Sequence, residues 1–249
     1  MNSVPASELL LRTRAREVIS YLRFLRVAVE KNVKVTASTA QEKLEHRVSR
    51  NLTYTLKANL YLLLYSAMEA TFTQLIDEMH DAIGVNTDSL DSLRSELFIL
   101  IIKNFKKSST PIPMEALPVS QTIMEMWCQE WRNKTKAKDK RKGTFAGNVD
   151  GLVMHQHMVS YGIVASIGDG KKPQPHLTHK SLEYAKDRRN QLAHGELGFS
   201  ELGRGQSLEE LNDHARAIFK TLVRIAQEIN QYLLAKGYLK ESDWNRPLQ

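Results

Sequence analysis

Three polar residues near the end of the chain could perform chemistry on a phosphate: Arg189, Asn190 and His194, within the segment KDRRNQLAHGE (186–196). Arginine can bind a phosphate through two parallel hydrogen bonds, and histidine titrates close to neutral pH, where it can transfer a proton. Asn190 lies one helical turn before His194, on the same face of a helix. These residue types at this spacing favour a site that binds an anion such as a phosphate.

A helix is predicted over Ser181 to His194, because apolar residues recur there at helical spacing. At about 100° per residue, one stripe has Arg189 at its centre and carries Leu182, Ala185, Leu192 and Ala193. A guanidinium on such a stripe must face a polar cavity, a carboxylate or an anionic ligand. Gly195 follows His194, so we expect the helix to end at His194, with Gly195 in the left-handed conformation.

Arg189 and His194 lie about 140° apart around a straight helix, so one chain would not aim both at one small target. Ala185 and Ala193 lie one turn on either side of Arg189, where small residues would let another helix approach closely. Two chains paired about a two-fold axis would bring two arginines and two histidines to one cleft. We therefore expect a homodimer with a composite site, in which a phosphate between the arginines offsets their repulsion.

Helical periodicity dominates the rest of the chain, which indicates an all-α fold. Helices are predicted at 18–29, 60–75, 90–101, 121–132, 149–161 and 208–233. Ser207 and Glu210 form a capping box at the start of the last helix. The segments STPIPMEALP (109–118) and GELGFSELGRGQ (195–206) are predicted to be loops. No convincing run of strands alternates with these helices.

Composition excludes several classes of protein. The single cysteine, Cys128, rules out an internal disulfide framework and is typical of a reducing cytosol. No signal peptide is recognisable, and no stretch reaches the roughly 20 apolar residues of a membrane span. The glycines form neither of the usual phosphate-binding patterns, and the histidine pairs 155/157 and 176/179 lack the spacing of metal ligands. We expect a cytoplasmic, soluble protein that binds no membrane, metal or cofactor.

The net charge of +7 and the pI near 9.4 favour a polyanionic partner. Much of the excess charge lies in RNKTKAKDKRK (132–142), which follows two tryptophans. Aromatic rings beside cations suit single-stranded nucleic acid, although a solvated loop explains the run equally well. The candidate RNA-binding residues are Trp127, Trp131, Arg132, Lys134, Lys136, Lys138, Lys140, Arg141 and Lys142.

Glu69 lies on a helix face with aromatic and aliphatic residues, so its carboxylate also requires a partner. Arg188 or Arg189 could supply it. This pair would either orient the helix that carries Arg189 or take part in the chemistry directly.

The segment RNQLAH (189–194) resembles the signature of the HEPN superfamily, in which an arginine and a polar residue precede a histidine by a few positions. NLYLLLYSAMEATFTQLIDEM (59–79) and TFAGNVDGLVMHQHMVSYGI (144–163) resemble the early helix and the middle segment of its stand-alone nuclease branch. The resemblance implies one HEPN-like bundle of long antiparallel helices over residues 1–249. The basic loop 132–142 and the Gly/Pro-rich segment 143–175 would then be insertions.

By this resemblance the protein would be a dimeric, metal-independent endoribonuclease. Its biological role would be that of a toxin or an antiviral defence effector. Arg189, Asn190 and His194 would be its catalytic residues, supported by Glu69 and Arg188. RNA would be the substrate, and an antitoxin or a defence-system protein a further partner. Two alternatives stay open: a non-catalytic HEPN-like module for RNA binding or assembly, and a purely structural bundle in which His194 caps a helix and Arg189 pairs with Glu69.

Overall fold

The computed structural model describes residues 5–30, 33–38, 43–87, 90–107, 123–129, 145, 148–163, 166–167, 172–173 and 175–240. The helices are α1 (Ala6–Glu30), α2 (Arg50–Asn86), α3 (Ser95–Lys107), α5 (Gly151–Ser160), α6 (Lys180–His194), α7 (Phe199–Arg204) and α8 (Leu208–Leu234), with a 3-10 turn at Leu90–Ser92. Residues 123–129 are also helical. Two antiparallel pairs of short strands complete the described part: β1 (Lys34–Ser38) with β2 (Lys43–Arg47), and β3 (Ser166–Ile167) with β4 (Lys172–Pro173). The predicted all-α class is confirmed.

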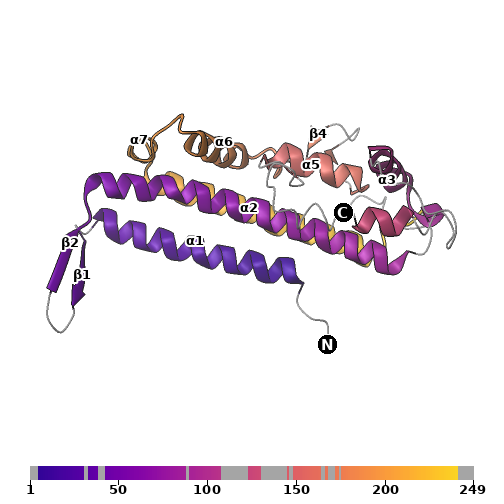
Figure 1. The fold of residues 1–249 in the computed structure, drawn as a ribbon, viewed down its shortest axis with the longest axis horizontal. Helices are drawn as coiled ribbons and strands as arrows, with labels where there is room; N and C mark the ends of the chain where they lie inside the picture. Colours follow the sequence, from indigo (N-terminus) through magenta and orange to yellow (C-terminus); the bar gives the residue numbers. More distant parts are fainter. Residues whose placement is uncertain are drawn as a thin grey trace.

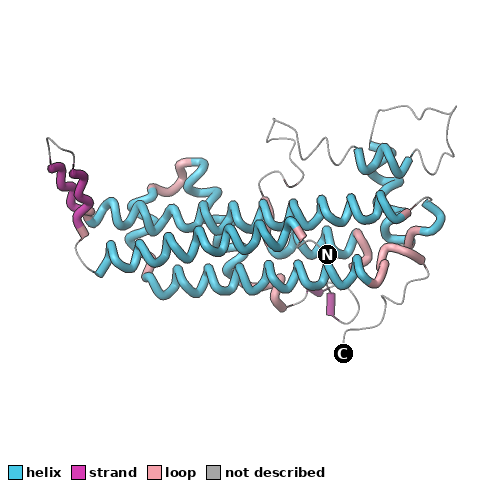
Figure 2. Tube along the Cα trace, turned by 90° about the horizontal axis from the view of Figure 1, so that it is seen from below, coloured by secondary structure: helices cyan, strands magenta, loops and turns pink. Residues whose placement is uncertain are grey.

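The long helix α2 is the centre of the bundle. It packs against α1, α6, α7 and α8. Figure 1 shows α1 on one side of α2 and α5, α6 and α7 on the other, and the long helices lie side by side in Figure 2. Leu60, Leu64, Ala67, Thr71 and Leu75, the predicted inner face, are fully buried. Tyr61, Met68, Phe72 and Ile76 are equally buried, because α2 has neighbours on several sides.

The last helix, α8, begins and packs as its sequence predicts. The Ser207 side chain accepts a hydrogen bond from the Glu210 backbone N–H, and the Glu210 side chain accepts one from the Ser207 N–H. This capping box satisfies two backbone donors that the first turn of a helix leaves unpaired. One apolar face is buried against the other helices; it consists of Leu211, Ala215, Ile218, Leu222, Ile225 and Ile229. α8 therefore supplies a rigid support for the helices that pack on it.

One prediction of local structure was wrong, and one pair of strands was not predicted. The segment predicted as a loop at 195–206 contains α7, which packs directly on α2. A Cβ at Gly203 would lie 1.8 Å from the Tyr54 carbonyl oxygen, so only glycine permits this approach. The glycines that suggested a loop are thus packing residues. The β1–β2 hairpin was also missed, because exposed positions such as Val35 and His46 give it no apolar pattern.

The third predicted helix starts later than its periodicity indicated. Leu90 and Leu93 are buried, but they lie in and after the 3-10 turn, and α3 begins only at Ser95. The backbone N–H of Arg94 donates to the Tyr238 carbonyl at 2.9 Å. The Arg94 guanidinium donates to the carbonyls of Gly162 and Gly237 at 2.8 and 3.0 Å. These contacts from distant segments interrupt the helix.

The predicted helix at 121–132 is helical over its described part, residues 123–129, and the one at 149–161 corresponds to α5. The predicted loop at 109–118 lies outside the described residues. In the part of the chain that the structure describes, no helix has the length and apolar character to span a lipid bilayer.

Candidate active site

Helix α6 carries the three candidate catalytic residues, and both of its ends are capped. At the start, the His179 side chain accepts a hydrogen bond from the Ser181 N–H at 3.2 Å. At the end, Gly195 has φ +71°, the left-handed conformation that the sequence predicts. Leu182, Ala185 and Leu192 are buried, so they fix the rotation of α6 on α2 and α8.

The guanidinium of Arg189 is held by an aromatic ring and an amide. It lies 4.7 Å from the centre of the Tyr65 ring, and its Nη1 donates to the Asn190 Oδ1 at 2.8 Å. Tyr65 comes from the middle of α2 and is 2% exposed. A cation over an aromatic face is attracted by the ring's negative face, without its charge being neutralised. Arg189 itself is partly exposed, so an anion from solution can reach it.

The predicted ion pair of Glu69 with Arg188 or Arg189 is absent from the described part of the chain. Arg189 lies over Tyr65, whereas Arg188 lies 4.5 Å from the Tyr184 ring and donates to the Gln191 Oε1 at 2.8 Å. Glu69 is partly exposed, so water can solvate its carboxylate and no buried partner is needed. The apolar surround inferred for Glu69 is the physical error in that prediction.

The short segment before α5 is tied to α6 and α2 next to Arg189. The Asn190 Nδ2 donates to the Asn148 Oδ1 at 3.3 Å, and the Val149 backbone N–H donates to the Tyr65 hydroxyl at 3.0 Å. The Asp150 carboxylate caps α5 by accepting from the Val153 N–H at 2.9 Å, and its other oxygen accepts from the Lys186 Nζ at 2.8 Å. The segment 148–150 therefore forms one wall of the site.

Two residues that contact this wall, Lys186 and Tyr65, have shifted pKa values. The hydrogen bond to Asp150 raises the pKa of Lys186, so the amine stays protonated. Burial raises the pKa of Tyr65, partly offset by its hydrogen bond from Val149 and by Arg189, so the phenol stays neutral. Lys186 precedes Asn190 by one turn, which places a second cation beside Arg189 on α6.

His194 lies at the exposed C-terminal end of α6, as predicted. It is about 140° around the helix from Arg189. The expectation for the two flanking alanines was half wrong: Ala193 is exposed, but Ala185 is fully buried inside its own chain. Of the two alanines, Ala193 is thus the one that is open to a second copy.

Arg188 belongs to a separate cluster that fixes α6 to its neighbours. The Tyr184 ring stacks on His214 of α8 with centroids 4.8 Å apart, and the His214 Nδ1 lies 2.9 Å from the Ser181 hydroxyl. Tyr184 also meets Tyr61 of α2 edge-on, at 5.5 Å between centroids. Arg188 joins this aromatic stack through the Tyr184 ring, whereas Arg189 lies over the Tyr65 ring.

The predicted RNA-binding residues divide between the core and the segment that is not described. Trp127 is 5% exposed, and its ring lies 4.0 Å from the ring of the buried His80. An aromatic ring buried in this way cannot serve as a stacking platform for bases, so that prediction was wrong for Trp127. Trp131 and the basic residues of 132–142 lie outside the described residues.

Sequence reasoning missed Tyr65, Asn148, Asp150 and Lys186. Lys186 could have been found from its position one turn before Asn190. The other three lie in 59–79 and 144–163, the two segments that resemble the HEPN nucleases, but nothing local shows which residues there meet α6. Among the described residues, no group of three or more His, Cys, Asp or Glu side chains is arranged to hold a metal ion.

Comparison with known protein families identifies a family for most of the chain. The model of the family described as HEPN_MAE_28990-like HEPN matches residues 11–238, which include α2, the segment 148–150 and all of α6. No curated protein and no solved structure matches the chain.

Proposed function

The chain belongs to the MAE_28990-like HEPN family, and from this premise we propose that it is a metal-independent endoribonuclease. RNA is cleaved by attack of a 2′-hydroxyl on the adjacent phosphorus, which breaks the bond to the 5′-oxygen. The products end in a 2′,3′-cyclic phosphate and begin with a 5′-hydroxyl. The biological role that fits this activity is that of a toxin or an antiviral defence effector.

The observation that carries the proposal is the position of Arg189. Its guanidinium is oriented by Tyr65 and Asn190, has no carboxylate partner among the described residues, and stays partly exposed. An arginine fixed in place with its charge not neutralised suits a phosphate, since guanidinium binds phosphate through paired hydrogen bonds. Asn190 adds an amide on the same side of α6, and Lys186, one turn earlier, is held by the Asp150 carboxylate. In the cleavage step, Arg189 stabilises the charge that develops on the phosphate oxygens.

His194 performs the proton transfers in this proposal. As a neutral imidazole it removes the proton of the attacking 2′-hydroxyl, and as an imidazolium it protonates the departing 5′-oxygen. One α6 directs Arg189 and His194 to different sides. The active unit is therefore a homodimer in which the exposed end of α6 brings His194 to a phosphate held by the partner subunit. The basic segment 132–142 contributes to the binding of RNA rather than to its cleavage.

The decisive experiment incubates mixed RNA with the purified protein in EDTA. Wild type should cleave RNA in the chelator, leave the matching DNA intact and produce cyclic-phosphate ends. His194→Ala should keep the fold and lower the cleavage rate by roughly 10²–10⁴, the usual contribution of a positioned acid or base. His46→Ala, at an exposed histidine of β2, is the matched control and should cleave as wild type does. Full activity in folded His194→Ala, or loss of activity in EDTA, would refute the proposal.

A second candidate is a non-catalytic HEPN-like module that binds RNA or joins an assembly. The divergence of Arg189 and His194 around α6 favours it, because a single chain does not bring both to one phosphate. This candidate predicts RNA binding that depends on Arg189, with no cleavage by any oligomer. Sedimentation velocity beside the cleavage assay separates the two: the nuclease requires an active dimer.

A further inference from the structure

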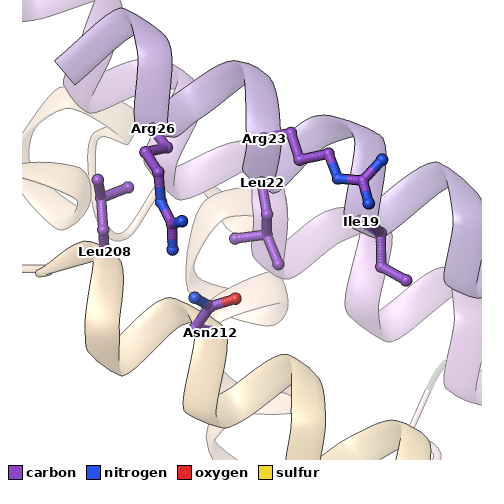
Figure 3. Close-up of a pocket in the computed structure, with 6 residues that line it drawn as sticks. All are labelled: Ile19, Leu22, Arg23, Arg26, Leu208 and Asn212. Atoms are coloured by element: carbon purple, nitrogen blue, oxygen red, sulfur yellow. The ribbon is translucent and has the colours of Figure 1, made fainter. Parts of the chain in front are cut away.

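A groove of about 210 Å³ lies between α1 and the first turns of α8, away from the candidate active site. Its lining residues are Ile19, Leu22, Arg23, Arg26, Leu208 and Asn212. Figure 3 shows Leu22 and Arg26 directed from α1 towards Leu208 and Asn212 on α8. α1 lies on the opposite side of α2 from α6 (Figure 1), so this α1–α8 groove is a separate surface.

The bottom of the α1–α8 groove is aliphatic. Leu22 and Leu208 pack against the core but stay partly exposed, and Ile19 is 47% exposed. A groove between two packed helices, with apolar side chains along it, has the shape that accepts the apolar face of a third helix.

The rim of the groove on α1 is strongly basic. Arg23 and Arg26 are exposed, and neither forms an ion pair within the described residues. Arg12 and Arg16 extend the same face of α1, since positions 12, 16, 19, 23 and 26 follow steps of three and four. Arg12 pairs with Glu8, whereas Arg16 has no such partner in the described part of the chain. The groove thus combines aliphatic surface with uncompensated positive charge.

We propose that the α1–α8 groove binds an acidic amphipathic helix of a partner protein. Apolar side chains of that helix cover Ile19, Leu22 and Leu208, and its carboxylates pair with Arg23 and Arg26. RNA would use the arginines but leave the aliphatic surface without a function, and a membrane is too flat to reach between two helices. A second copy joined through this face would bring the basic rims of the two α1 helices together across the two-fold axis. Charge and shape together favour the acidic helix.

The test selects binders from a displayed library of random 20-residue peptides, using wild-type protein as bait. The selected peptides should carry leucine or isoleucine at steps of three and four, flanked by glutamate or aspartate. By fluorescence anisotropy, Arg23→Glu with Arg26→Glu, and separately Ile19→Ser, should each weaken binding at least about tenfold, as expected of residues central to an interface. Lys103→Glu with Lys240→Glu makes the same change of charge on exposed residues elsewhere and should leave binding unchanged. All substituted side chains are exposed, and circular dichroism verifies folding.

Three results would overturn the inference. The selection could enrich no acidic helix, or its peptides could bind the groove variants as tightly as wild type. Single-stranded RNA or vesicles of anionic phospholipid could lose affinity with Arg23→Glu and Arg26→Glu but keep it with Ile19→Ser, which would identify a polyanion as the occupant. Sedimentation could show that these variants turn a dimer into a monomer, which would identify a second copy of the chain.

Discussion

Replacing Tyr65 with phenylalanine isolates one hydrogen bond of the candidate active site. The Tyr65 hydroxyl accepts from the backbone N–H of Val149 at 3.0 Å, and both residues are buried. Phenylalanine keeps the ring beneath Arg189 but leaves this N–H without its partner. An unsatisfied buried donor costs about 1–3 kcal/mol, so the free energy of unfolding should fall by that amount.

A second variant, Tyr65→Leu, separates the role of the Tyr65 ring from that of its hydroxyl. Tyr65→Leu also removes the aromatic face under Arg189, an interaction worth about 0.5–2 kcal/mol. In Tyr65→Phe, Arg189 should keep its orientation, and RNA cleavage at saturating substrate should stay within a few-fold of wild type. In Tyr65→Leu, Arg189 loses its support, so the cleavage rate should fall well below that of Tyr65→Phe.

Urea denaturation followed by circular dichroism measures the stability of both variants. Tyr54→Phe is the matched control, because the described structure shows no hydrogen bond from the Tyr54 hydroxyl. Burial raises the pKa of Tyr65, so its phenol is neutral and the stability difference should not vary between pH 6 and 9. A loss in Tyr65→Phe no larger than in the control, or equal cleavage by the phenylalanine and leucine variants, would refute this reasoning.

Gly203→Ala should lower the free energy of unfolding by about 1–3 kcal/mol, since its Cβ would meet the Tyr54 carbonyl oxygen at 1.8 Å. An unchanged midpoint in urea denaturation would contradict the packing of α7. Burial lowers the pKa of His176 to about 4. The unfolded chain therefore binds more protons below the ordinary pKa of about 6.5, and stability should fall as the pH falls from 6.5 towards 4. His176→Gln should show a weaker fall over that range, and an identical one would contradict the assignment. Serine in place of Lys138, Lys140, Arg141 and Lys142 should weaken RNA binding and reduce its salt dependence while sparing the cleavage rate at saturation; unchanged binding would make 132–142 a solvated loop.

The long helices could be predicted because their signals are local. Apolar residues at steps of three and four mark α2 and α8. Ser207 with Glu210 marks the start of α8, and Gly195 marks the end of α6, through contacts within a few residues. α7 could not be predicted, since glycine indicates a loop unless the close approach of Gly203 to Tyr54 is known.

For the candidate site, the sequence predicts the relative positions of residues on one helix but not the contacts between helices. Arg189, Asn190 and His194 share α6, so periodicity and the end of the helix give their relative positions. Their partners come from α2 and from the segment before α5, and no spacing reports which side chains meet. The same limit explains Trp127, because a tryptophan near cations suits both a stacking platform and a core. Its contact with His80 decides for the core.

Among the described residues Glu69 and Arg189 form no ion pair, and this favours the proposed chemistry. Had Glu69 paired with Arg189, the two charges would have cancelled, and a phosphate would have had to displace the carboxylate before binding. The Tyr65 ring orients the Arg189 guanidinium while leaving its charge intact. Asn190 accepts a hydrogen bond from one N–H of Arg189, and a guanidinium has five such donors. The buried Tyr65 is itself fixed by Val149, so the support is rigid. Arg189 therefore needs no rearrangement to receive an anion, which is the property that stabilisation of a transition state requires.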